Sequence, residues 1–339
     1  MIRSRCLVSQ SILILALLVT CATAQTPTAE LTELHFGIIS TETSKALKEG
    51  FEPWLADMAQ FLGIPVKGFY APDYAGVIEA MRFGKVHVAW FGNKSALEAV
   101  TRADGEVCAQ TVDIHGNPGY WSLIVAHKDS PYNTIEEIIA AGKKLKFGNG
   151  DPNSTSGFLV PAYYLWAPRG LDPNTHFGMV RTANHETNLL AIVNKQIDFA
   201  TNNTESLQRL KEKDAPAHAQ IKIIWQSPLI PSDPIVWRQD LSREMKSKLK
   251  SFFLSYGRSG SDAARQREVL AKVSSGWAPF HDSNNAQLLP IRELDLVKDK
   301  LKLENSNSLS TDEKQTKIAV IDKELAELQQ YRTLLEKFH

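Results

Sequence analysis

The sequence predicts an α/β protein built as two lobes. From Leu34 onward one unit recurs, in which a short run of β-branched or aromatic residues is followed by a polar loop and an amphipathic helix. Alternation of this kind is typical of βαβ units with a mostly parallel sheet. The unit breaks off once and then resumes, which predicts the second lobe. Since 43% of the 339 residues are hydrophobic, the chain has ample core material and is not disordered.

Three strand and helix pairs are expected in the first lobe. Strands are predicted at residues 34–40, 66–71 and 86–91. The first helix follows Thr41-Glu42-Thr43-Ser44 and ends near Gly63. The other two helices are predicted at residues 74–83 and 94–102.

Residues 107–129 interrupt this alternation of strands and helices. Two apolar runs, at residues 107–112 and 120–126, are separated by the turn His115-Gly116-Asn117-Pro118-Gly119, with no helix between them. The pattern indicates either a hairpin or a crossover that leads out of the first lobe.

The second lobe repeats the unit, and the chain then returns. Helices are predicted at residues 134–141, 155–167, 186–195 and 204–213, and strands at residues 145–148, 179–181, 197–201 and 221–225. The extended stretch at residues 227–238 contains prolines and is interpreted as a return crossing. Helices at residues 242–256 and 262–273 then complete the first lobe.

The N-terminal residues form a predicted secretory signal peptide. Arg3 and Arg5 precede an apolar run at residues 11–19, and Ala22-Thr23-Ala24 is a small-x-small cleavage pattern. Cleavage after Ala24 predicts an exported, periplasmic chain. A competing interpretation is a lipoprotein box that would leave a lipid anchor on Cys21.

Charge and cysteine content limit the classes of function. The 38 Lys and Arg residues balance 38 Asp and Glu residues, which argues against a protein that holds nucleic acid or anionic lipid through its overall field. Small anions are not excluded as ligands. Cleavage would remove Cys6 and Cys21, so Cys108 is expected alone, as a small apolar residue of a strand.

The C-terminal tail is charged and helical. Ser310 and Glu313 form a capping box, and an apolar stripe follows at near-heptad spacing, made of Ile318, Ile321, Leu325, Leu328 and Leu335. Such a helix either packs against the body of the protein or pairs with its copy in a homodimer.

The loop at residues 147–157 is the strongest candidate for a binding site. It joins a strand to a helix, where ligands of open α/β sheets bind. Ser154, Thr155 and Ser156 supply three hydroxyls beside the first-turn N–H groups of the helix, and Gly148, Gly150 and Gly157 allow close backbone approach, which together predict an oxyanion cradle. The loop lacks the Gly-Lys-Ser/Thr of a Walker A motif and the spacing of a dinucleotide fingerprint.

Other polar residues have ordinary structural explanations as well. His185 lies in the first turn of a helix, where it is either a surface or core residue or a donor to the same oxyanion. Glu205 suits the positive end of a helix, and Asp233 suits a turn between two prolines. Tyr74 and Tyr120 fit as core aromatics.

Enzyme signatures are absent from the sequence. The nine histidines show no H-E-x-x-H or H-x-H spacing, and there is no nucleophile elbow and no pair of cysteines for zinc. No catalytic residue, metal or cofactor is therefore expected.

Taken together, several segments resemble the periplasmic phosphonate-binding proteins of bacterial phosphonate ABC transporters. The similar segments occur in the same order from about residue 34 to beyond Arg292. The C-terminal tail is similar only in its charged, helical character. The segments that carry it lie at residues 36–42, 71–76, 119–122, 148–157, 185–188, 200–205 and 227–231. One departure is Phe91, where relatives often have Tyr.

The resemblance implies a type II, Venus-flytrap receptor with hinge crossovers and a helical C-terminal extension. The implied division is 1–24 signal peptide, 25–122 first part of lobe 1, 123–226 lobe 2, 227–295 return part of lobe 1 and 296–339 C-terminal extension. The phosphonate oxygens would bind Ser154, Thr155, Ser156 and His185. The aminoalkyl end would meet Tyr74, Tyr120, Glu205 and Asp233.

The resemblance also implies a function. We expect a non-enzymatic receptor that captures organophosphonates, 2-aminoethylphosphonate in particular, and delivers them to the ABC permease in the inner membrane. The alternatives are a receptor for phosphite, phosphate or another small oxyanion, a periplasmic phosphonate or phosphoester hydrolase, and a sensor subunit.

Overall fold

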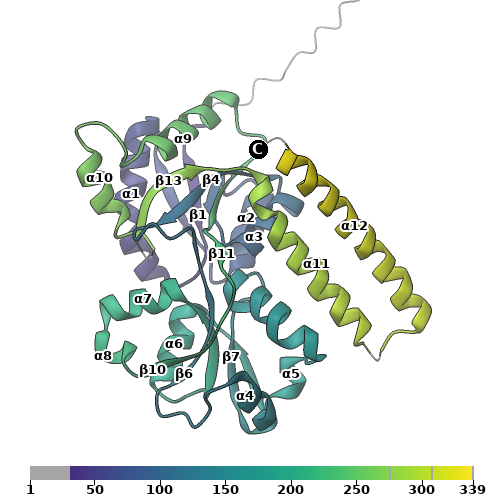
Figure 1. Ribbon diagram of the computed structural model, residues 1–339. Helices are drawn as coiled ribbons and strands as arrows, with labels where there is room; N and C mark the ends of the chain where they lie inside the picture. The colour runs from purple at the N-terminus through teal and green to yellow at the C-terminus, as the bar shows by residue number, and fades with distance from the viewer. Residues whose placement is uncertain (1–30, 275, 307, 338–339) are drawn as a thin grey trace, which may run out of the picture. The chain divides into compact units, whose positions relative to one another are not determined.

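The computed structural model describes residues 31–274, 276–306 and 308–337. Within these ranges the chain forms two large sheets with their helices and a pair of long C-terminal helices (Figure 1). The predicted signal peptide, its cleavage after Ala24 and the alternative anchor at Cys21 lie outside the described residues. Among the helices of the described ranges, none has the length and apolar character needed to cross a bilayer.

The first lobe is built on a six-stranded sheet. Its strands are β1 (Leu34–Ile38), β2 (Val66–Tyr70), β3 (Val88–Trp90), β4 (Gly105–Asp113), β12 (Pro234–Arg238) and β13 (Trp277–Asp282). They lie in the order β13-β4-β12-β3-β1-β2. The helices of this lobe are α1 (Ser44–Leu62), α2 (Tyr74–Arg82), α3 (Asn93–Arg102), α9 (Arg243–Ser255) and α10 (Ala263–Leu270).

The ends of these helices follow from local sequence. The Thr43 side chain caps α1 by accepting a hydrogen bond from the Ala46 N–H, at 3.4 Å. The same helix ends at Gly63, whose φ of 73° suits glycine, so the predicted helix end is confirmed. Asp73 caps α2 in the same manner, at 2.8 Å from the Gly76 nitrogen. These caps place the start of each helix beside the end of a strand.

The second lobe is built on a five-stranded sheet. Its strands are β6 (Ser122–His127), β7 (Lys146–Asn149), β8 (Met179–Thr182), β9 (Phe199–Asn203) and β10 (Ile221–Gln226). They lie in the order β10-β6-β9-β7-β8. The helices of this lobe are α4 (Ile135–Ala141), α5 (Pro173–His176), α6 (His185–Val193), α7 (Thr204–Lys213) and α8 (Ala215–His218).

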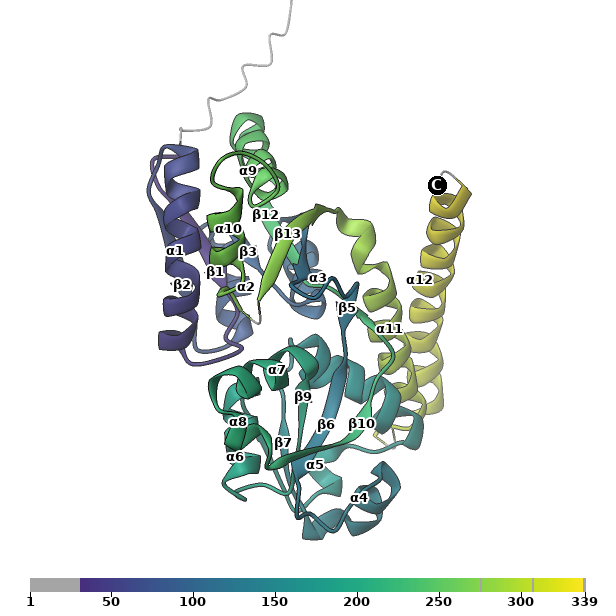
Figure 2. The ribbon, with the colours of Figure 1, turned by 60° about the vertical axis from the view of Figure 1, so that its left-hand side comes forward.

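Two crossovers connect the lobes. Short strands β5 (Gly119–Tyr120) and β11 (Ile230–Pro231) pair with each other in antiparallel fashion between the two sheets (Figure 2). β4 pairs with β12 and β13, whereas β6 pairs with β9 and β10. The interruption after β4 is therefore a crossover, and the hairpin interpretation is wrong.

The sheets also correct two other expectations. Strands β1, β2 and β3 run parallel, as do β7, β8 and β9, but the crossing strands β6 and β12 pair in antiparallel fashion. Both sheets are therefore mixed, and not mostly parallel.

Strand β13 is not expected from the sequence, because Pro279 within it removes a backbone donor. It is tolerated because β13 lies at the sheet edge, with an irregularity between Ala278 and His281.

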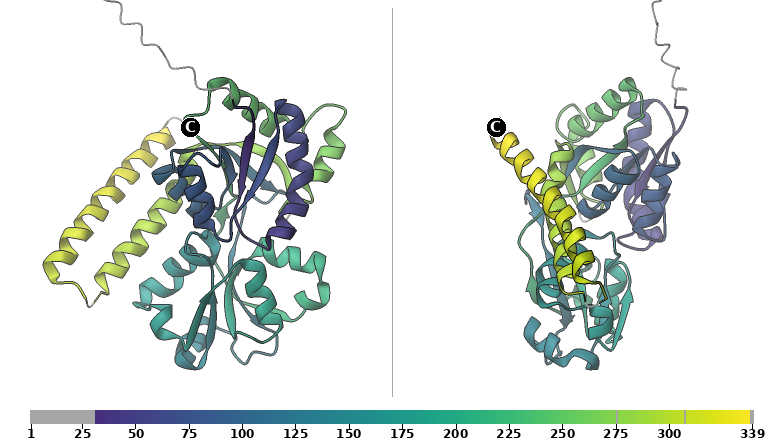
Figure 3. Two further views of the ribbon diagram at one scale, coloured as in Figure 1. Left: turned by 180° about the vertical axis from the view of Figure 1, so that it is seen from behind. Right: turned by 90° about the vertical axis from the view of Figure 1, so that its right-hand side faces the viewer.

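The C-terminal residues form two neighbouring helices, α11 (Leu289–Glu304) and α12 (Thr311–Lys337) (Figure 3). The capping box is confirmed, since Ser310 Oγ accepts from the Glu313 N–H at 3.3 Å and Glu313 accepts from the Ser310 N–H at 2.9 Å. Leu328 of the apolar stripe is buried, and Arg332 pairs with Glu293 of α11 at 2.6 Å. The stripe thus packs within its own chain. Pairing with a second copy stays a prediction.

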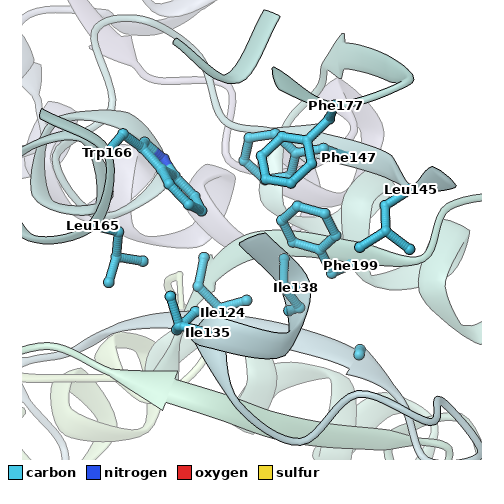
Figure 4. Close-up of a cluster of buried hydrophobic side chains, with 10 residues drawn as sticks. Ile124, Ile135, Ile138, Leu145, Phe147, Leu165, Trp166, Phe177 and Phe199 are labelled. Carbon is cyan, nitrogen blue, oxygen red and sulfur yellow. The ribbon is translucent and has the colours of Figure 1, made fainter. Parts of the chain in front are cut away.

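A cluster of aromatic side chains forms the core beneath the second sheet (Figure 4). Phe147 of β7 stacks on Phe199 of β9, with ring centroids 4.6 Å apart, and Phe177 and Trp166 close the cluster at its edges. Phe147 and Phe199 are almost completely buried. This packing fixes the end of β7, from which the candidate binding loop departs.

Replacement of Phe147 by alanine is predicted to lower the free energy of unfolding by about 3–5 kcal/mol, because it leaves a cavity in this cluster. Urea denaturation followed by circular dichroism measures the loss. The control is Phe83→Ala, at a side chain that is 69% exposed, with an expected change within about 0.5 kcal/mol. A loss below about 1 kcal/mol for Phe147→Ala would contradict the assigned packing.

Candidate functional site

A cavity between the two sheets gathers the polar residues from both lobes. In this conformation the cavity is nearly closed, with about 20 Å³ of space for the centre of a water-sized group. All of the site residues predicted from the sequence line it. The lining consists of Ile39, Thr41, Tyr74, Trp90, Gly92, Tyr120, Ser154, Thr155, Ser156, His185, Asn203, Glu205, Ser206, Arg209, Asp233 and Ser274.

The cradle loop begins where β7 ends and leads into a helical segment. Ser154 caps this segment, since its Oγ accepts a hydrogen bond from the Gly157 N–H at 3.0 Å. Ser154, Thr155 and Ser156 are each only 2% exposed. The segment starts with a wide π-helical turn, closed by the Val160 N–H on the Thr155 carbonyl, and not with the regular α-helix expected. Such turns often occur at functional sites.

Glycines allow this loop to fold back on itself. A Cβ atom on Gly150 would lie 2.6 Å from the backbone of Gly157, and one on Gly148 would lie 2.5 Å from the Ile197 side chain. A Cβ atom on Gly157 would lie 2.8 Å from Ser154 Oγ. The glycines therefore permit close packing of the loop against the protein itself.

The cradle hydroxyls are held by neighbouring donors. Thr155 Oγ1 accepts from the backbone N–H of Lys94 in α3, at 2.8 Å, and this bond joins the two lobes. Ser156 Oγ accepts from the Asn203 side-chain amide at 3.1 Å. A hydroxyl that accepts one hydrogen bond still carries its own O–H donor. The arrangement therefore leaves hydroxyl protons that can be donated to an anion.

His185 lies beside the cradle in the first turn of α6. Its Nε2 is 3.5 Å from Ser154 Oγ and 3.4 Å from the Asn203 side-chain nitrogen. Burial lowers the pKa of His185 to about 4, so the imidazole is neutral at physiological pH and keeps one N–H donor. Its Nδ1 is buried without a hydrogen-bond partner in the described part of the chain.

An acidic residue faces the cavity from the return crossing. Asp233 accepts hydrogen bonds from Trp90 Nε1 and from the Tyr120 hydroxyl, both at 3.1 Å. Burial raises the pKa of Asp233 to about 7, although these two bonds act in the opposite direction. Asp233 is thus placed to take up negative charge when a cation approaches.

Tyr74 and Glu205 complete the set from opposite lobes. The Tyr74 N–H at the start of α2 donates to Asp151 Oδ2 of the cradle loop, at 3.1 Å. Tyr74 lines the cavity together with Ser154, whereas the Tyr120 hydroxyl donates to Asp233. Burial raises the pKa of Tyr74 well above its usual value. Glu205 lies in the first turn of α7 and lines the same cavity.

Eight of the lining residues are not among the candidates from the sequence, and Asn203, Trp90 and Arg209 are three of them. Asn203 lies within the segment at residues 200–205, and its position before α7 is a signal for a cap, which it forms with the Ser206 N–H at 2.7 Å. Trp90 gave no signal, because its partner Asp233 is 143 residues away along the chain. Arg209 gave none either, since a basic residue within a helix is ordinarily a solvated one.

Solved structures identify the class. A binding protein component of an ABC phosphonate transporter from Pseudomonas aeruginosa superposes with a TM-score of 0.86 at 50% identity, covering 91% of this chain and all of that chain. A Prochlorococcus marinus protein in complex with methylphosphonate superposes with a TM-score of 0.67 at 20% identity, covering 78% of this chain and 97% of that chain. At this identity the match shows the fold alone. The protein is a two-lobed, type II periplasmic binding protein.

The family follows from the sequence comparisons. The family described as "ABC transporter, phosphonate, periplasmic substrate-binding protein" matches residues 36–288. The chain is also 48% identical to the phosphonates-binding periplasmic protein of Escherichia coli K12 over 302 residues, covering 89% of this chain and 87% of that protein. The chain therefore belongs to the periplasmic substrate-binding proteins of phosphonate ABC transporters, which act in transport.

The raised pKa of Asp233 makes stability depend on pH. The buried carboxyl keeps its proton up to about pH 7, whereas the unfolded chain releases it near 3.8, so this group destabilises the folded state increasingly as the pH rises between these values. Asp233→Asn removes the effect. We compare the unfolding free energies of Asp233→Asn and the wild type, both without ligand. The variant's advantage over the wild type should increase by up to about 3 kcal/mol from pH 5 to pH 8. Urea denaturation at both pH values gives this difference, and one that stays constant would contradict it.

Proposed function

We propose that this protein captures organophosphonates, with 2-aminoethylphosphonate as its ligand, and releases them to the ABC permease of the inner membrane. The observation that carries the proposal is that one cavity holds two kinds of polar group. Hydroxyl and N–H donors lie at residues 154–156 and 185, and Glu205 and Asp233 line the same space with carboxyl groups. A zwitterion with an anionic group and an ammonium group would use both kinds.

The phosphonate oxygens would bind Ser154, Thr155, Ser156 and His185. Each charge-assisted hydrogen bond contributes about 1.5–3 kcal/mol, so a few of them offset the cost of ordering the closed form. None of these four residues is a Lys or an Arg. Helix N-termini aim partial positive charge at the anion, so a fully charged partner is not required.

The amino end would contact Tyr74, Tyr120, Glu205 and Asp233. An ammonium group beside Asp233 would favour its ionised form, and so would lower its pKa from about 7. A phosphite or phosphate ion could use these carboxyl groups only as acceptors for its own P–O–H protons, whereas an ammonium group pairs with their charge. The acids therefore favour an aminoalkyl phosphonate over an inorganic oxyanion.

Titration calorimetry against four ligands tests the proposal. 2-Aminoethylphosphonate should bind more tightly than methylphosphonate, phosphite or phosphate, because only this ligand places a cation against the acids. Equal affinity for phosphite and 2-aminoethylphosphonate would contradict the amine assignment. Turnover of a phosphonate or phosphoester that depends on His185 would contradict a role confined to binding.

The cradle is tested by the triple change of Ser154, Thr155 and Ser156 to alanine. This variant should lose calorimetric binding of both 2-aminoethylphosphonate and methylphosphonate, because each ligand has lost the same oxygen donors. Its far-ultraviolet circular dichroism should remain that of the folded protein. Retained binding of either ligand within about tenfold of the wild type, or about 1.4 kcal/mol, would exclude the cradle as the oxyanion site.

The amino end is tested by Glu205→Gln. This change should weaken 2-aminoethylphosphonate by about tenfold or more, while the affinity for methylphosphonate should change by less than about threefold. The matched control is Glu212→Gln, a carboxylate on the exposed face of the same helix. Equal weakening of both ligands by Glu205→Gln would assign Glu205 a structural role.

A further inference from the structure

A buried carboxylate of the first lobe pairs with cations of the second lobe. Glu42 follows β1, and its side chain is only 4% exposed. One of its oxygens lies 2.8 Å from Lys213 Nζ, and the other contacts the guanidinium of Arg209. Both cations belong to α7, the helix that also carries Glu205. The proposed ligand contacts do not involve Glu42, which does not line the cavity.

Arg209 has a second anchor in the first lobe. Its Nη2 donates to Ser274 Oγ, at 3.0 Å, in the segment after α10. Arg209 lines the ligand cavity on one side, and on the other it lines an outer hollow together with Glu42 and Lys213. The guanidinium therefore lies in the wall between the cavity and the outer surface.

We propose that Glu42 is a ligand-retention residue, whose ion pairs with α7 hold the lobes closed and must break before the ligand can leave. The partners come from different lobes, so the pairing exists only in the closed form and stabilises that form alone. The pair with Arg209 is protected from screening by salt because both side chains are largely buried, whereas Lys213 is half exposed. Thr43, the next residue in the chain, also joins the two lobes, because its N–H donates to Glu186 Oε2 at 2.9 Å.

Retention by this route has a specific kinetic signature. Because Glu42 holds the lobes and not the ligand, its loss should accelerate the dissociation of every ligand by a similar factor. A residue acting on the ligands through its charge would instead change the rates of 2-aminoethylphosphonate and methylphosphonate by different factors, since only one of them carries an ammonium group. The inference rests on the proposed function for the choice of these ligands.

Stopped-flow fluorescence of dissociation tests this with Glu42→Gln, which keeps the shape of the side chain and removes its charge. The dissociation rates of both ligands should rise by about tenfold or more, because one partner of a buried pair has been removed. The control is Glu52→Gln, a carboxylate on α1 that pairs with Lys48 of its own helix at 3.4 Å, and its rates should match the wild type. Unchanged rates in Glu42→Gln, or rates that change by different factors for the two ligands, would overturn the inference.

A second measurement needs no ligand. Spin labels at Lys48→Cys and Lys211→Cys, both exposed and in different lobes, report the separation of the lobes by pulsed electron paramagnetic resonance, and the buried Cys108 stays unlabelled. Glu42→Gln should shift the distances toward longer values. Identical distributions would overturn the inference even if the wild type bound no phosphonate, a result that by itself would contradict only the proposed function.

Discussion

The hydrogen bond from the Lys94 N–H to Thr155 Oγ1 is the contact on which the site depends. It is 2.8 Å long and joins the first turn of a first-lobe helix to the middle of the cradle. The Tyr74 N–H makes a second such contact with Asp151 of the same loop. The loop proposed to bind the anion is thus also a loop that joins the lobes, so the proposed occupation of the cradle would be linked to closure of the cleft.

The proposed anion site needs no overall positive charge, and the formal net charge of the chain is zero. The cradle supplies hydroxyl and N–H groups at helix ends, and His185 is held neutral by burial. Arg209 does line the cavity, but Glu42 balances its charge from the other lobe. The remaining titratable groups proposed to contact the ligand are the carboxyl groups of Glu205 and Asp233, which accords with a ligand that carries an ammonium group as well as an anion.

Periodicity and capping signals predicted the successive strand and helix units, because these depend on residues close together in the sequence. They also predicted the cradle, whose hydroxyls are consecutive. Contacts between segments that are distant in the sequence could not be predicted from local patterns. Asp233 meets Trp90 only because β12 returns to pair with β3, and no local pattern joins Glu42 to Arg209. For the same reason, the residues proposed to contact the amino group come from the family resemblance, and not from spacing.

A crystal structure of the protein with 2-aminoethylphosphonate tests the coupled cradle and cleft most directly. The phosphonate oxygens should lie within hydrogen-bonding distance of Ser154, Thr155, Ser156 and His185, with the amino group between Glu205 and Asp233 and the Thr155 to Lys94 bond intact. A ligand bound in the reverse orientation, or bound to one lobe with the cleft open and that bond broken, would contradict the link between anion binding and closure.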